Sequence, residues 1–136
     1  MKYNTQNFLT EKVESGRVGS FYEVLAAVKK QIDFDTFRED TAQAKEICLI
    51  IAEILCLPDG TEVGMGGERI PIEIVKNIYS RLRYEHVEAV IDAFSTIKYE
   101  IKYEKAYLRK ALYNSVFEYE SDIRNQVASD FAGYGK

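Results

Sequence analysis

The chain is organised around one strongly apolar segment, residues 41–57. Its apolar side chains recur at helical spacing, and further leucine and isoleucine residues occupy the other sides of the same helix. A helix that is apolar on more than one side is usually buried on more than one side. Pro58 and Gly60 end this segment, because proline and glycine interrupt helices. We therefore expect the helix to lie at the centre of a hydrophobic core.

The same segment is too short to cross a membrane. Its apolar run from Ile47 to Leu57 contains Glu53 and has about half the ~20 residues that a membrane span needs. The N-terminal residues lack the apolar region of a signal peptide. We therefore expect a cytoplasmic protein without membrane contact, in which Cys48 and Cys56 are buried thiols, too far apart on one helix to form a disulfide.

Helical periodicity recurs along most of the chain and predicts an all-α fold. The length of 136 residues fits one domain. We expect a linker or arm at 1–19, a compact bundle of five to six helices at 20–131 and a frayed tail at 132–136. Capping-box patterns at Ser20 with Glu23 and at Asp40 with Gln43 predict two helix starts. A last weak helix is expected around Ile123, Val127 and Phe131.

One short region departs from the helical pattern. Val63 and Met65 alternate with glycine, and the Gly66-Gly67 pair favours a tight turn with positive φ. Pro71 follows at a position typical of the first turn of a helix. The sequence therefore predicts one small β-hairpin inserted between helices. A phosphate-binding loop is the weaker alternative, because the glycine spacing fits no common phosphate motif.

The segment 98–117 is rich in tyrosine, lysine and arginine. On a helix from about Glu104, Leu108, Ala111, Leu112 and Ser115 share one face, which we expect to be the core face. If the helix extends one turn further back, an adjoining stripe is basic and carries tyrosine. The simplest interpretation is a solvated outer face. The functional alternative is a binding surface, whose candidate residues are Lys102, Lys105, Arg109, Lys110 and Tyr113.

Nothing in the sequence supports catalysis. His86 is the only histidine, and beside Glu85 and Glu88 we interpret it as a structural residue. The carboxylate pairs have the pattern of solvated helix edges, and no nucleophile can be paired with a second histidine. We expect a protein that is not an enzyme, without a metal, cofactor or small-molecule substrate. The net charge of −4 makes the chain as a whole a poor attractor of nucleic acid.

Three phrases together resemble one known family. They are Val28–Asp35 (VKKQIDFD), Val63–Lys76 (VGMGGERIPIEIVK) and Leu82–Phe94 (LRYEHVEAVIDAF) continued by Ile101–Asn114. In this order they are similar to phrases in the C-terminal domain of RepA-type replication initiators, which occur on plasmids and integrative elements of low-GC Gram-positive bacteria. Tyr107-Leu108 followed by Ala111-Leu112-Tyr113-Asn114 is the most specific part of the resemblance.

The resemblance implies a DnaD-like helical domain. It implies a parent protein in which a winged-helix domain binds the origin, whereas the C-terminal domain recruits host replication machinery, with the primase DnaG as partner. The DnaD-type terminal helix has tryptophan where this chain has Tyr113 and Asn114, and this departure weakens any transfer of single-stranded DNA binding.

We therefore expect a protein-interaction module of a replication initiator that recruits a primase or a helicase-loading factor. One alternative is a DNA-binding module that uses the basic, tyrosine-bearing segment 102–113 for weak binding. The acidic residues from Glu118 to Asp122 argue against it. The other alternative is a stand-alone helical domain that self-associates.

Overall fold

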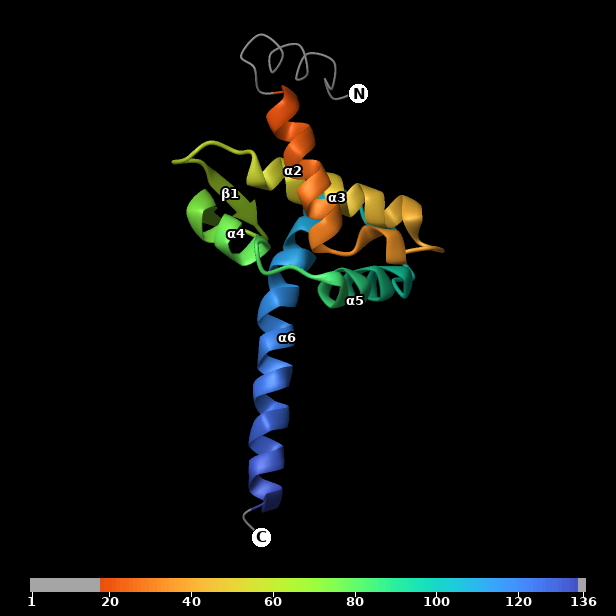
Figure 1. The fold of residues 1–136 in the computed structure, drawn as a ribbon, viewed down its shortest axis with the longest axis vertical. Coiled ribbons are helices and arrows are strands. Elements are labelled where there is room, and N and C mark those ends of the chain that lie inside the picture. The colour runs from red at the N-terminus through yellow and green to blue at the C-terminus, as the bar shows by residue number, and fades with distance from the viewer. Residues whose placement is uncertain (1–17, 135–136) are drawn as a thin grey trace.

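The computed structural model describes the backbone of residues 18–134 and the side chains of residues 20–121. Five α-helices and one β-hairpin make up the described part of the chain (Figure 1). The predicted helical fold with one small inserted hairpin is confirmed. The expected arm at 1–19 lies outside the described residues, except that a helix already begins at Val18.

The first two helices pack against each other at the start of the domain. Helix α2 (Val18–Gln31) leads through a short 3₁₀ turn, η1 (Phe34–Thr36), to helix α3 (Thr41–Leu55). Asp33 adopts a left-handed conformation with φ of 57° and breaks the helical path between them. Helix α2 begins two residues before Ser20, so Ser20 is not its N-cap, contrary to the sequence prediction.

Helix α3 forms the centre of the core, as its sequence predicts. It packs against α2, α4, α5 and α6, and the fully buried side chains on it include Ala44, Ile47, Cys48, Ile51 and Ala52. Asp40 occupies its N-cap position, but its side chain makes no capping hydrogen bond, so the predicted capping box is wrong. Instead the Thr41 hydroxyl donates to the Phe37 and Arg38 carbonyl oxygens at 2.7 and 3.2 Å.

The hairpin follows α3. Strands β1 (Glu62–Met65) and β2 (Glu68–Pro71) pair antiparallel, with Val63 opposite Ile70 and Gly64 opposite Arg69. Gly66 and Gly67 have φ of 61° and 95°, the positive values predicted for this turn. Val63 and Met65 point into the core while their neighbours are exposed, so the hairpin covers one side of the core.

Helices α4 (Ile72–Tyr79) and α5 (Tyr84–Ser95) continue the core. Helix α2 is joined to α4 by the side chain of Gln31, which donates to the carbonyl oxygens of Tyr79 and Leu82 at 3.0 and 2.8 Å. These bonds tie the end of α2 to the last residue of α4 and to the segment that follows it.

Helix α6 (Glu104–Tyr134) is the longest element, with 31 residues. Its N-terminal part lies among the shorter helices, and the rest extends away from them as one helix (Figure 1). The separate last helix predicted around Ile123 is therefore wrong, because the helix continues without a break. The predicted tail also shortens, since α6 reaches Tyr134; residues 135–136 lie outside the described residues.

Candidate functional site

The N-terminal part of α6 completes the core. Leu108, Leu112 and Val116 are fully buried, and Ser115 is nearly so. Their spacing places them on one face of the helix, which packs against α3, α4, α5 and β1. The predicted core face is thus confirmed. Beyond Val116, none of the residues 117–121 is buried, which marks where α6 leaves the core.

Two contacts fix the orientation of this part of α6. The Tyr79 hydroxyl on α4 donates to the Arg109 backbone carbonyl oxygen at 2.8 Å. On the other side, the Lys105 ammonium lies 2.7 Å from the Glu53 carboxylate on α3. Tyr79 is fully buried, and burial raises the pKa of its hydroxyl well above the usual value of 10.0, against the opposing effect of the Arg109 charge. Lys105 and Arg109 consequently lie side by side next to α3.

These two cations border a hollow between α3, β1 and α6, which we call the α3–α6 groove. It has a volume of about 290 Å³. Four apolar side chains line it, Ile50, Ile54, Leu57 and Val63, together with Glu53, Glu62, Gly64, Lys105 and Arg109. An apolar surface bordered by a few charged groups is the usual composition of a binding site.

The charges around the groove are unevenly paired. Lys105 is paired with Glu53, and Glu62 accepts from Arg69 at 3.2 Å on the exposed face of the hairpin. Arg109 takes part in none of the ion pairs found among residues 20–121. The groove therefore carries one guanidinium that forms no ion pair among residues 20–121, because Glu53 and Glu62 engage other cations.

The other predicted site residues lie elsewhere. Lys102 precedes the start of α6 at Glu104, so it is not on the helix, and its ammonium lies 5.4 Å from the centre of the Tyr103 ring. The predicted stripe thus loses its first member, because the segment before Glu104 is not helical. Lys110 lines a second hollow of about 260 Å³ against α5, and the end of its side chain lies near Gly66 in the turn of the hairpin. Tyr113 is half-buried and packs edge-on against Phe117.

The structure therefore brings together only Lys105 and Arg109 of the five predicted residues. Sequence reasoning missed the α3 and hairpin side of the groove, above all Glu53 and Gly64. Glu53 interrupts an apolar helix, which was the one signal that its side chain lies at the edge of the core. Nothing in the sequence indicates that this carboxylate meets Lys105.

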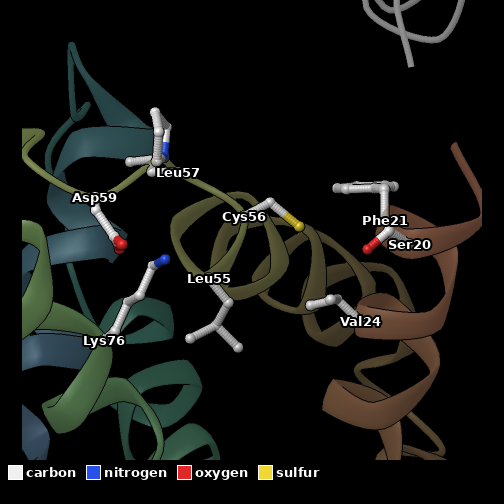
Figure 2. Close-up of a pocket in the computed structure, with 9 residues that line it drawn as sticks. Ser20, Phe21, Val24, Leu55, Cys56, Leu57, Asp59 and Lys76 are labelled. Atoms are coloured by element: carbon white, nitrogen blue, oxygen red, sulfur yellow. The ribbon is translucent and has the colours of Figure 1, made fainter. Parts of the chain in front are cut away.

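A separate and larger hollow lies between the start of α2 and the end of α3. It has a volume of about 430 Å³, and its lining includes Phe21, Leu55, Cys56, Asp59 and Lys76 (Figure 2). Figure 2 shows the Asp59 carboxylate and the Lys76 ammonium extending toward each other from the loop after α3 and from α4. The Cys56 sulfur points toward α2 on the opposite wall. Cys48, deeper in α3, is buried, and burial raises the pKa of its thiol to about 11.

His86 has a structural role within α5. Its Nδ1 accepts a hydrogen bond of 2.8 Å from the Arg83 backbone amide at the start of the helix, and its ring packs edge-on against Tyr119 of α6. Burial lowers the pKa of this imidazole, while Glu85 has the opposite effect. Among residues whose side chains are described, no three histidine, cysteine or acidic residues are grouped as a metal site.

Comparison with known families matches residues 10–133, nearly the whole chain, to one family model. The chain belongs to DUF6017, a family of unknown function. The range matched to DUF6017 includes every residue that lines the α3–α6 groove. No curated protein and no solved structure matches the chain. In the described part of this DUF6017 chain, no helix combines the length and apolar character required to cross a bilayer.

Proposed function

We propose that this DUF6017 domain is a non-enzymatic docking module of a replication initiator on a plasmid or another mobile element. It recruits a host replication protein, the primase DnaG or a helicase-loading factor, to the origin. The proposal takes its direction from the resemblance of three phrases to RepA-type C-terminal domains, and with it a DnaD-like arrangement of the helices.

One observation carries the proposal. Two of the three phrases that carry the resemblance meet at the α3–α6 groove: Val63 and Gly64 from the hairpin phrase, and Lys105 from the terminal phrase. The same phrases also supply core residues such as Leu108 and Leu112, which hold these groove residues in place. A surface built jointly by segments far apart in the sequence suits recognition of another protein.

The DNA-binding alternative has less support. It needs a continuous basic surface, because affinity for nucleic acid depends on phosphate contacts. Lys105 is already paired with Glu53, Lys102 is off the helix, and Glu53 and Glu62 lie in the same groove as Arg109. These carboxylates repel phosphate groups.

A retention experiment tests the proposal. The intact chain is immobilised and incubated with purified DnaG from a low-GC Gram-positive bacterium, next to the variants Arg109→Ala and Arg38→Ala. Arg38 is the matched control, since it is exposed and lies beyond the other end of α3. We expect retention of the primase by the wild type and by Arg38→Ala, and at least about tenfold weaker retention, or about 1.4 kcal/mol, by Arg109→Ala.

Absence of primase retention by the wild type contradicts the proposal. A fluorescence anisotropy titration with single-stranded and duplex DNA at low salt serves as the counter-experiment. Tight binding that falls steeply as salt rises favours the DNA-binding alternative instead.

A further inference from the structure

We infer that the α3–α6 groove binds a short peptide segment of another protein, in which an apolar side chain is accompanied by a single carboxylate that pairs with Arg109. The inference rests on the proposed function and specifies the chemistry of the partner. It follows from the size of the groove, from its lining and from Arg109, the one charged residue of that lining that forms no ion pair among the described residues.

The size of the groove favours a peptide side chain. Its volume of about 290 Å³ lies just below the range of about 300–1,000 Å³ that is usual for small-molecule and cofactor sites. The apolar part of the lining comes from Ile50, Ile54 and Val63, which are 2%, 4% and 6% exposed, and from the half-buried Leu57. These side chains are held by the core, so the surface is preformed and one or two apolar side chains can be buried on it.

The charge of the groove selects a carboxylate. Arginine presents planar donors that match the two oxygens of a carboxylate, and Arg109 has no ion-pair partner among the described residues. The neighbouring Lys105 is already engaged by Glu53 at 2.7 Å. A partner with one acidic group therefore gains an ion pair without competing with an existing one.

The same lining limits how acidic the partner can be. Glu53 and Glu62 also border the groove and already engage Lys105 and Arg69, so the groove has no second available cation for a further negative charge on the bound segment. A phosphate backbone, which carries several negative charges, is therefore disfavoured. A peptide that carries one aspartate, one glutamate or a C-terminal carboxylate is not. The observations thus favour a protein segment over nucleic acid.

Gly64 provides a way to block the groove. It lines the groove, and a Cβ atom added to it has no heavy atom within 4 Å. Its φ is not positive, so a side chain is tolerated by the strand. Gly64→Tyr is therefore expected to fold and to add a bulky ring beside the groove, since tyrosine is favourable in strands.

Peptide selection tests the inference. The intact chain is used to select binders from a phage-displayed library of short random peptides, and the enriched peptides are synthesised and titrated against variants. We expect enriched sequences that combine leucine-like residues with one aspartate or glutamate. Arg109→Glu and Gly64→Tyr are each expected to weaken binding at least about tenfold. Arg38→Glu, with the same change of net charge, leaves binding unchanged.

One further variant is expected to act in the opposite direction. Glu53→Gln removes the carboxylate that engages Lys105, so that a second cation becomes available to the peptide. We expect affinity to rise severalfold. The inference is overturned if no peptide is enriched, if the enriched peptides lack acidic residues, or if they bind Arg109→Glu and Gly64→Tyr as tightly as the wild type. It is also overturned if a second copy of the chain occupies the groove, seen as concentration-dependent dimerisation that Gly64→Tyr abolishes.

The outcome is separable from that of the proposed function. If acidic, apolar peptides bind at Arg109 but the primase is not retained, the groove is a docking site and the replication role fails. If the primase is retained equally by Arg109→Glu and the wild type, the replication role stands and the groove is not its site.

Discussion

The hydroxyl of Tyr79 lies 2.8 Å from the backbone carbonyl oxygen of Arg109, to which it donates a hydrogen bond. Tyr79 is fully buried at the end of α4, whereas the Arg109 side chain lines the α3–α6 groove. This bond therefore connects the core to the candidate binding surface, and it sets the position from which the guanidinium extends.

Replacing Tyr79 by phenylalanine is expected to cost about 1 kcal/mol of unfolding free energy at neutral pH, the usual value of one hydrogen bond. The cost stays small because a helical carbonyl also accepts from the amide four residues later, so Arg109 is not left unsatisfied. Urea denaturation of the wild type and of Tyr79→Phe measures this loss of unfolding free energy. A loss above about 3 kcal/mol contradicts this explanation, since it requires an unsatisfied buried group.

Tyr79 also predicts a dependence of stability on alkaline pH. Burial raises the pKa of its hydroxyl above the 10.0 of an unfolded tyrosine, so the unfolded state releases this proton first as pH rises. Above about pH 10 the unfolded state binds fewer protons, and stability falls by up to about 1.4 kcal/mol per pH unit from this group. Between measurements below and above about pH 10, the unfolding free energy should decrease less for Tyr79→Phe than for the wild type. Parallel decreases in the two proteins would rule out this origin.

His86 predicts a loss of stability at acidic pH, in contrast to the alkaline loss expected from Tyr79. Burial lowers the pKa of its imidazole below 6.5, and its Nδ1 must be unprotonated to accept from Arg83. Below about pH 6.5 the unfolded state binds the proton more readily, so stability falls as pH decreases, by at most about 1.4 kcal/mol per pH unit. His86→Gln keeps an acceptor at this position of the helix and should reduce the slope. An unchanged slope in thermal unfolding from pH 7 to pH 5 would exclude His86 as its source.

The hairpin provides a pair of glycine variants, one in its turn and one in strand β1. Gly66 has φ of 61°, and an added Cβ would approach the Lys110 Cε to 2.7 Å, which the flexible end of that lysine can relieve. Gly66→Ala is therefore expected to cost about 1–2 kcal/mol, mainly from backbone strain. Gly64→Ala meets no neighbour and should be neutral or stabilise by up to about 1 kcal/mol. Chemical denaturation distinguishes them, and equal effects at both positions would refute the assigned turn.

Local patterns in the sequence predicted most of the fold. The Gly66-Gly67 pair marked the hairpin because only glycine adopts such φ values easily, and the start of α6 at Glu104 followed from the spacing of Leu108 and Leu112. Helix ends were less predictable. Asp40 has the residue type of a cap, yet the Thr41 hydroxyl makes the bonds at this end.

The candidate site was predictable only in part. Lys105 and Arg109 were identified because they share a helix face, which is a local relationship. Their surroundings depend on tertiary packing: Glu53 meets Lys105 only because α3 and α6 pack together, and Gly64 reaches the groove through the hairpin. No local spacing contains that information. For the same reason, helical spacing did not indicate that Lys102 precedes α6 or that Lys110 lines the hollow against α5.

The most direct test of docking at the α3–α6 groove is a map of amide chemical-shift changes in the isotope-labelled chain as unlabelled primase is added. We predict that the changes concentrate at Glu53, Leu57, Gly64, Lys105 and Arg109, and that they disappear in Gly64→Tyr. Changes concentrated at the opposite end of α3, around Arg38 and Asp40, or no changes up to about 100 μM primase, would contradict docking at this groove.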